Sequence, residues 1–222
     1  VHKGVGVGIA GRRVERLRAL QQELGEDKVY VAEMDVTAED APERLDALIS
    51  KMGAPDLMMY ASGIGKQNPE LDPAIELNTV ATNSAGMVRL VVHFLNYVKS
   101  EDFYNSKHRA HIAVITSVAG TKGMGSAPAY SATKSMQSAY LTALAQYVRM
   151  YDVPALFSDI RPGFVATEIL NSEKRYPMLM TPQTAAKYII RGLKRRTRVI
   201  IFDWRFKLVV LFWRMIPRFL WE

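Results

Sequence analysis

Tyr130 and Lys134 lie four positions apart in the stretch "AYSATKSMQSAY", residues 129–140. The stretch is rich in helix-forming and small residues, and side chains four apart on a helix share one face. A phenol with a pKa of about 10 exchanges protons poorly at neutral pH, whereas a neighbouring ammonium favours the phenolate. The spacing fits a proton-transfer pair, but taken alone it is more typical of an ordinary surface pair.

Apolar and amphipathic segments alternate along the chain around this pair. Segment 56–62 has no polar alternation, which is typical of a strand buried on both faces. The alternation predicts an α/β fold, a doubly wound and mostly parallel sheet covered by helices on both faces. The expected strands are 5–11, 28–35, 56–62, 111–117, 155–163 and 198–203, and the expected helices are 12–24, 41–53, 74–98, 129–150 and 182–194.

Composition excludes several kinds of chemistry. The chain of 222 residues has no cysteine, so it forms no disulfide and uses no thiolate. The four histidines show no metal-ligand spacing, and we predict no metal site. No apolar run approaches the roughly 18 residues that span a bilayer. The net charge of +7 is concentrated in the last thirty residues without a nucleic-acid recognition motif, so no nucleic-acid partner is expected.

Polar residues at the expected strand ends extend the pattern. Ser117 ends a strand thirteen residues before Tyr130, and further motifs follow the same order along the chain. This set resembles the short-chain dehydrogenase/reductase family from about Val5 to Phe202. Because several motifs occur in the family's order, the resemblance is far more specific than the Tyr–Lys pair alone. The further motifs are "MDVT" (34–37), "YASG" (60–63), "NSAG" (83–86), "ITSVAG" (115–120) and "RPGFVAT" (161–167).

The resemblance implies a Rossmann-like three-layer α/β/α fold over 1–203 and an oxidoreductase that transfers a hydride between nicotinamide and a carbonyl/alcohol substrate. Tyr130 would be the general acid/base and Lys134 would lower its pKa and bind the nicotinamide ribose. Ser117 would orient the substrate oxygen, and Asn83 would hold a water that links Lys134 to solvent. The resemblance also implies a cytoplasmic homodimer or homotetramer, assembled through the two long helices.

Cofactor choice depends on the end of the first expected strand. No acidic residue stands there, and Arg12 and Arg13 follow at once. Because guanidinium suits a 2′-phosphate, we predict that NADP(H) is preferred over NAD(H), with Arg12 at the phosphate and Arg13 stacked on adenine. The alternative is that one of these arginines simply opens a charged helix. The other cofactor contacts implied by the resemblance are Asp35, Val36, Ala61, Ser62, Gly63, Tyr130, Lys134, Pro162, Gly163, Val165 and Thr167.

The sequence departs from the family at its glycine-rich turn. The family's TGxxxGxG segment is absent, because the glycines of "KGVGVGIAG" lie in and before a strand. We expect the family's first strand and helix to be missing, with that strand's place lying between the strands that begin near Val5 and Asp56. The chain would then be a truncated reductase, or a non-catalytic binding or scaffold protein that lost phosphate binding. Both hypotheses stay open here.

Two further segments are expected to shape the substrate site. Residues 164–181 occupy the family's lid position and carry apolar side chains, while 63–68 and 121–128 would form the other pocket walls. An apolar carbonyl or alcohol substrate is therefore expected. The pattern of basic, aromatic and apolar residues in segment 204–222 predicts an amphipathic helix that is too short to cross a bilayer. It would lie at the inner membrane surface on anionic lipid, or dock on its own domain or on a second copy.

Overall fold

The computed structural model describes residues 6–100, 103, 109–168, 170 and 175–221. Strands and helices alternate along the chain, as the sequence predicts. The strands are β1 (Val7–Gly11), β2 (Val29–Glu33), β3 (Leu57–Tyr60), β4 (Ala110–Ile115), β5 (Ala155–Arg161) and β6 (Val199–Ile201). The helices are α1 (Val14–Leu24), α2 (Ala41–Met52), α3 (Pro73–Val80), α4 (Gly86–Val98), α6 (Pro128–Met150), α7 (Pro182–Lys194), α8 (Trp204–Met215) and α9 (Arg218–Trp221).

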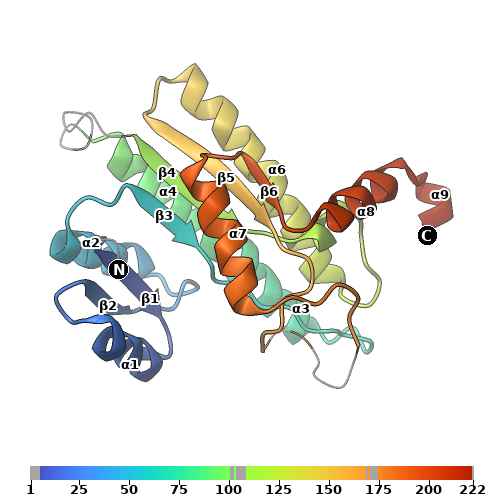
Figure 1. Cartoon of the computed structure of the whole chain (residues 1–222), viewed down its shortest axis with the longest axis horizontal. Coiled ribbons are helices and arrows are strands. Elements are labelled where there is room, and N and C mark those ends of the chain that lie inside the picture. The colour runs from blue at the N-terminus through green and yellow to red at the C-terminus, as the bar shows by residue number, and fades with distance from the viewer. Residues whose placement is uncertain (1–5, 101–102, 104–108, 169, 171–174, 222) are drawn as a thin grey trace.

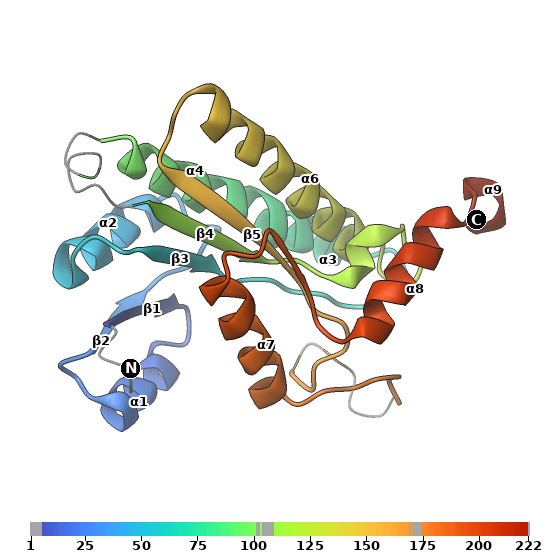
Figure 2. The same ribbon diagram turned by 45° about the horizontal axis from the view of Figure 1, so that its top comes forward.

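All strand pairs in the described residues are parallel, and they form two hydrogen-bonded groups. One group is β1–β2, and the other runs in the order β3–β4–β5–β6. Helices α4 and α6 lie on one side of the four-stranded group, and α7 lies on the other (Figures 1 and 2). This three-layer arrangement confirms the predicted α/β/α class.

Successive side chains of the central strand β4 point alternately into two hydrophobic clusters, one on each face of the sheet. Ile112 and Val114 are fully buried in a cluster with residues of α4 and α6. Ala113 points to the opposite face, where it belongs to a smaller cluster with Ala185 of α7 and Ile200 of β6. Both faces of β4 are therefore covered, as expected for a central parallel strand.

Strand β3 differs from this expectation. Its side chains Leu57 and Met59 are 41% and 44% exposed, so the prediction of burial on both faces is wrong for these residues. Among the described strands β3 pairs only with β4, and the cluster beneath α7 draws its strand residues from β4, β5 and β6. One face of β3 thus has no covering layer in the part of the chain that the structure describes.

Two expected helices are interrupted. The expected helix 74–98 contains a π-helical turn at Ala81–Ala85, labelled η1, between α3 and α4. The expected helix 204–222 ends as α8 at Met215 and restarts as the short α9. Ile216 adopts an extended conformation because it precedes Pro217, whose ring disfavours the helical region for the preceding residue.

A short 3₁₀ turn, η2 (Val118–Thr121), follows β4 and packs closely on α6. At Gly120 an added Cβ would lie 2.6 Å from the carbonyl carbon and 2.8 Å from the carbonyl oxygen of Lys134. These are backbone atoms of a long helix, so they cannot move aside as a flexible side chain can. Gly120 therefore permits the approach that brings the end of β4 beside α6.

We expect Gly120→Ala to lower the free energy of unfolding by about 1 to 3 kcal/mol, because the new methyl group forces η2 away from α6. Gly123→Ala is the matched control, since an added Cβ there meets nothing within 4 Å. Urea denaturation of both variants measures the difference. Equal stabilities would contradict the close-packing argument.

Candidate active site

Ser117 stands just beyond the carboxyl end of β4, where a parallel sheet presents ligand-binding residues. It is buried, and its Oγ accepts a hydrogen bond from the Ala119 amide at 3.1 Å, which caps η2. The amide of the preceding Thr116 donates to the Ile160 carbonyl of β5 at 2.7 Å. These contacts fix Ser117 at the edge of the sheet.

Helix α6 carries Tyr130 in its first turn. The amide of Ala129 donates to the Glu76 carboxylate at 2.8 Å, so an acidic side chain from α3 satisfies the helix N-terminus. One turn later the Lys134 Nζ lies 5.8 Å from the centroid of the Tyr130 ring. The two side chains thus share one helical face, as their spacing predicts.

Lys134 is a buried cation, with its side chain only 4% exposed. Its Nζ donates to the Ile115 carbonyl at 2.9 Å and to Gln137 Oε1 at 3.1 Å. Burial lowers the pKa of Lys134 to about 8, and the nearby charge of Asp159 opposes that shift. The ammonium is therefore poised to titrate close to neutral pH.

Burial raises the pKa of the Tyr130 phenol, while its hydrogen bond with the Ser117 side chain lowers it. The net direction is opposite to the lowering expected from the sequence. Burial is the larger effect, and the Lys134 ammonium is directed to the Ile115 carbonyl and to Gln137. In this arrangement the phenol is held in its protonated form.

Asn83, in η1, is fully buried and joins two parts of the site. Its Oδ1 accepts from the Ile64 amide at 2.9 Å, and its Nδ2 donates to the Ile64 carbonyl at 2.8 Å and to Thr133 Oγ1 at 3.1 Å. Its own carbonyl accepts from Gln137 Nε2 at 2.6 Å. These contacts tie the loop after β3 to α6. The water-holding role suggested by the sequence stays a prediction.

Gln137 is a further member of this buried network, and the sequence analysis did not single it out. It is fully buried and touches both Lys134 and the Asn83 carbonyl. Its place three residues after Lys134 puts it on the same helical face, and that spacing is the signal that could have found it. Gln137 lines neither of the two cavities described below, and its contact with Lys134 Nζ helps to hold the lysine in place.

A cavity of about 940 Å³ opens between β1, the loop after β3 and the segment after β5. We call it the polar cavity because several charged side chains line part of it. Its mouth is cationic at the start of α1. Gly163 lines a second cavity instead, and among the described residues Pro162 and Val165 line neither cavity. The predicted cofactor residues that line the polar cavity are Arg12, Arg13, Asp35, Val36, Ala61, Ser62, Gly63 and Thr167.

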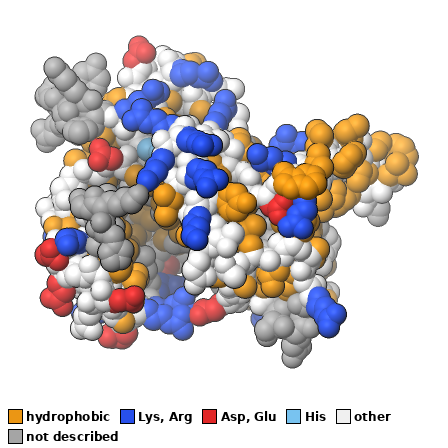
Figure 3. Space-filling view, in the orientation of Figure 1, with side chains coloured by type: hydrophobic (Ala, Val, Ile, Leu, Met, Phe, Trp, Pro, Cys, Tyr) orange, Lys and Arg blue, Asp and Glu red, His pale blue; other side chains and the backbone are white. Residues whose placement is uncertain are grey.

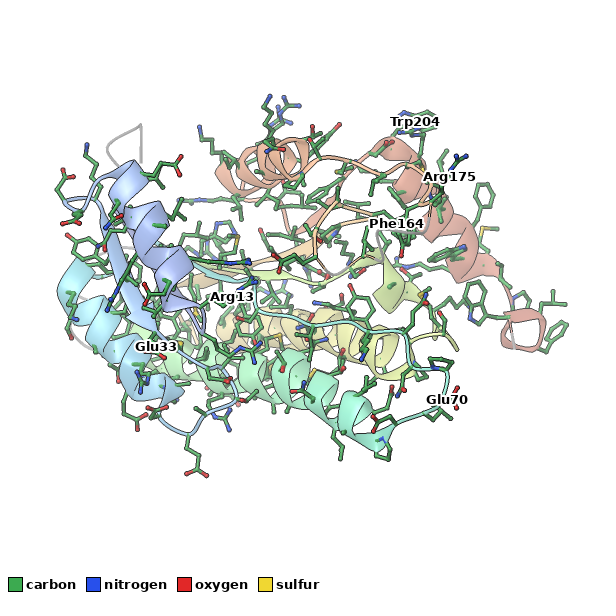
Figure 4. The ribbon with its side chains drawn as sticks, turned by 90° about the horizontal axis from the view of Figure 1, so that it is seen from below. Arg13, Glu33, Glu70, Phe164, Arg175 and Trp204 are labelled. Carbon is green, nitrogen blue, oxygen red and sulfur yellow. The ribbon has the colours of Figure 1, made fainter. Side chains whose placement is uncertain are left out.

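Glu168 bridges the mouth of this cavity. Its two carboxylate oxygens lie 2.8 Å from the guanidinium nitrogens of Arg13 and Arg16. Hydrogen bonds from Arg16 and Arg13 lower the pKa of Glu168 to about 2. Arg13 lies at the end of α1 that faces the rest of the molecule (Figure 4). The arginine pair thus already holds an anionic group, and neither Arg16 nor Glu168 was predicted from the sequence.

Arg12 lies on the other side of the polar cavity, near Asp35. Its guanidinium is 3.9 Å from the Asp35 carboxylate, a loose and exposed ion pair. Asp35 is fixed mainly by Thr37, whose amide and hydroxyl donate to Asp35 Oδ1 at 2.9 and 2.7 Å. These hydrogen bonds lower the Asp35 pKa, so the carboxylate stays charged at neutral pH. Arg12 is therefore only weakly held.

An apolar cavity of about 880 Å³ adjoins the polar one, and both are lined by Gly65. An added Cβ at Gly65 would lie 2.6 Å from the Tyr130 ring, so this loop packs directly on the phenol. The expected walls and lid supply much of the remaining surface together with α8, although residues 169 and 171–174 of the lid lie outside the described residues. Lining side chains include Ser117, Met124, Tyr130, Phe164, Tyr176 and Met178.

The chain fits the two ends of a nicotinamide dinucleotide. Cations at the mouth of the polar cavity suit phosphate. Gly63 lines this cavity and packs against the lysine, because an added Cβ there would lie 3.2 Å from Lys134 Nζ. Within the described residues no glycine-rich turn opens a helix at this cavity to receive the diphosphate between those ends.

Comparison with known proteins identifies the family to which the chain belongs. The family model for short chain dehydrogenase matches residues 1–177. An uncharacterized oxidoreductase of Myxococcus xanthus is 29% identical, covering 99% of this chain and 86% of its own. The NADP-dependent 3-hydroxy acid dehydrogenase YdfG of Escherichia coli is 27% identical, covering 85% of this chain and 79% of its own. A Burkholderia phymatum short chain dehydrogenase/reductase, solved in complex with NAD, shares the fold with a TM-score of 0.81 at 17% identity, covering 94% and 83%.

The chain belongs to the short-chain dehydrogenase/reductase family. It is an oxidoreductase of the class that acts on CH–OH and C=O groups, and members of this class use nicotinamide cofactors and small-molecule substrates. In the part of the chain that the structure describes, every helix is too short or too polar to cross a bilayer.

We expect Lys134 to titrate near pH 8 in the folded protein. The folded pKa lies below the unfolded one, so the charged lysine costs stability below about pH 8 and that cost disappears as pH rises. Relative to a Lys134→Met variant, the wild type should gain up to about 1.4 kcal/mol per pH unit between about pH 8 and 10. Urea denaturation across this range measures the gain, and NMR of ¹³C-labelled lysine side chains measures the pKa. A Lys134 pKa near 10.5 would contradict the burial argument.

Proposed function

We propose that the protein is an NADP(H)-preferring reductase or dehydrogenase that moves a hydride between nicotinamide and an apolar carbonyl/alcohol substrate. Tyr130 is the general acid/base, and Ser117 and Lys134 assist it. One observation carries the proposal: Ser117 and Tyr130 lie on the wall of an apolar cavity where it adjoins a polar cavity with a cationic mouth. A substrate in the first cavity would lie beside a cofactor in the second.

The reaction needs a proton donor beside the substrate oxygen. The cofactor, when bound, supplies or accepts the hydride. During reduction, Tyr130 Oη gives its proton to the substrate oxygen, which Ser117 Oγ orients by a hydrogen bond. The raised pKa of the phenol keeps this proton in place until the oxygen gains charge. The Lys134 ammonium then stabilises the phenolate, and Asn83 supports the loop beside it.

The NADP preference is supported by charge at the polar cavity. Arg12 and Arg13 stand at its mouth and no acidic residue ends β1. The ion pair between Arg12 and Asp35 is loose. A 2′-phosphate could take the place of Asp35 and accept a charge-assisted hydrogen bond from the Arg12 guanidinium. The Escherichia coli relative, named as NADP-dependent, uses the same cofactor type.

A homodimer or homotetramer would assemble through the long helices, as the family resemblance implies. Apolar side chains are exposed on these helices, including Leu77 and Val80 of α3 and Met150 of α6 at 68%, 44% and 72%. Such side chains are ordinary components of a subunit interface. We place this assembly in the cytoplasm.

The competing function is a non-catalytic binding or scaffold protein with the same fold. The intact triad of Ser117, Tyr130 and Lys134 favours the enzyme, because a protein without chemistry has no reason to bury a cation beside a phenol at a cavity wall. On the other side, no glycine-rich turn opens a helix at the polar cavity within the described residues. Titration with NADPH separates the two hypotheses.

We expect Arg12→Asp to weaken NADPH binding by about tenfold or more while leaving NADH binding nearly unchanged, because the guanidinium would meet only the 2′-phosphate. Cofactor fluorescence titration measures both affinities. Arg18→Asp is the matched control, since Arg18 lies on α1 outside the polar cavity.

The same titration tests the Glu168 bridge. Glu168→Gln should tighten NADPH binding, because it releases Arg13 and Arg16 from a competing carboxylate. If the wild-type chain bound neither nucleotide, the proposed enzyme function would fail for this polypeptide. An unchanged NADPH affinity in Arg12→Asp would remove only the cofactor preference.

We expect Tyr130→Phe to reduce the turnover of NADPH with a panel of apolar ketones by about 10² to 10⁴-fold, because the proton donor is lost. NADPH affinity should change little, so the two readouts separate chemistry from binding. Tyr140→Phe is the control, since Tyr140 lies on the same helix but packs against the core cluster and lines neither cavity. Equal turnover by the wild type and Tyr130→Phe would refute the assigned role.

A further inference from the structure

Helix α8 docks on the domain by one face only. Phe206 and Val210 are buried against Val118 of η2, and Phe206 fills the space above Gly163. Val209 and Trp213, on the same side, line the apolar cavity. The inner face of α8 is therefore a wall of the proposed substrate site.

The outer face of α8 is apolar and exposed, and it continues into α9. Both helices project from the body of the molecule, and orange apolar side chains dominate this projection in Figure 3. Trp204 points outward at the start of α8 (Figure 4). The exposed side chains are Trp204 (68%), Leu208 (42%), Leu211 (53%), Phe212 (61%), Met215 (70%), Phe219 (79%) and Leu220 (67%).

Basic residues flank this outer face. With about 100° between successive residues, Arg205 borders it on one side and Lys207 and Arg214 border it on the other. Residues 204–221 contain no acidic residue. Arg205 is paired with Asp203, the residue before α8, whereas within the described residues no ion pair is found for Lys207 or Arg214.

This charge pattern favours an anionic lipid surface over a second copy of the chain as the binding partner of the outer face. A symmetric interface with a second copy would place the same basic residues of two chains close together, and like charges would then oppose association. An anionic lipid surface offers the complementary charge and accepts apolar side chains between its headgroups. Trp side chains and long basic side chains suit this interface, because each has an apolar body and a polar end.

The bend between α8 and α9 keeps α9 beside the segment that follows η2. Lys122 Nζ donates to the Ile216 carbonyl at 2.8 Å and lies 5.8 Å from the Trp221 ring centroid, while Trp221 Nε1 donates to the Gly123 carbonyl at 2.7 Å. The segment after η2 therefore supports both helices. It also supplies Met124 to the wall of the apolar cavity.

We infer that α8 and α9 form a docking surface for anionic lipid membranes. Docking would place the apolar cavity directly behind a helix that lies on the bilayer, where a carbonyl or alcohol substrate with a long apolar portion is concentrated. The substrate class rests on the proposed function, whereas membrane docking itself needs neither cofactor nor turnover. The two can therefore fail separately.

The test is co-sedimentation of the full chain with vesicles of phosphatidylcholine and phosphatidylglycerol, compared with phosphatidylcholine alone. Binding should appear only with the anionic vesicles and weaken as salt rises. All three tryptophans lie in 204–222, and Trp204 is 68% exposed on the outer face, so the emission should shift to shorter wavelength on binding. Nicotinamide binding is measured separately, without vesicles.

A matched pair of variants tests the face. Leu211→Glu should weaken vesicle binding by about tenfold or more, because it places a carboxylate on the docking surface. Ile190→Glu on α7 should have little effect, although both side chains are 53% exposed in the wild type. Thermal unfolding checks that both variants are folded.

Any one of three vesicle results would overturn the inference. They are absence of binding to anionic vesicles, equal binding to neutral vesicles, and equal loss of binding in Ile190→Glu and Leu211→Glu. Concentration-dependent self-association that shifts the tryptophan emission without lipid would also overturn it, and would assign the surface to a second copy. NADPH binding without vesicle binding would leave the proposed enzyme function standing.

Discussion

The burial of the Lys134 ammonium is the constraint on which the site depends. Removing a charge from water is costly unless its hydrogen bonds are replaced, so the chain must bring acceptors to Nζ. One acceptor is the Ile115 carbonyl at the end of β4, and the other is Gln137 on the same helix. The lysine thereby requires α6 to pack closely on the strand end, and Gly120 allows that packing.

The same network reaches the wall between the two cavities. Gln137 bonds to the Asn83 carbonyl, and the Asn83 side chain holds both backbone groups of Ile64. That loop continues to Gly65, which packs on the Tyr130 ring and lines both cavities. The π-helical turn at Asn83 is therefore part of the site, in keeping with the frequent occurrence of such turns at functional positions.

The sequence predicted the elements better than the contacts between them. The pair Thr181-Pro182 predicted the start of α7, and the structure shows Thr181 Oγ1 accepting from the Thr184 amide. Local chemistry of this kind is visible in a few neighbouring residues. The bridge from Glu168 to Arg13 was not visible, because it joins residues 155 positions apart and neither has a distinctive local motif.

The predicted lowering of the Tyr130 pKa is not seen because burial raises that pKa, and burial also depends on distant parts of the chain. Helical spacing places an ammonium near a phenol, but it does not reveal which acceptor the ammonium chooses. Here the carbonyl at the end of β4 and the amide of Gln137 receive it, and neither contact follows from the spacing of Tyr130 and Lys134. The strand-end positions of the site residues, in contrast, followed from the alternation of strands and helices.

The strands form two separate hydrogen-bonded groups, and this affects how firmly the two parts of the sheet are held together. Because β1 and β2 pair only with each other among the described strands, no strand ladder joins them to the four-stranded group. A two-stranded unit has little stability of its own. The polar cavity has walls from both groups, with Gly11 on one side and Ser62 on the other. Any molecule bound there would act as a cross-link between the halves, and its binding free energy would become part of the folding free energy.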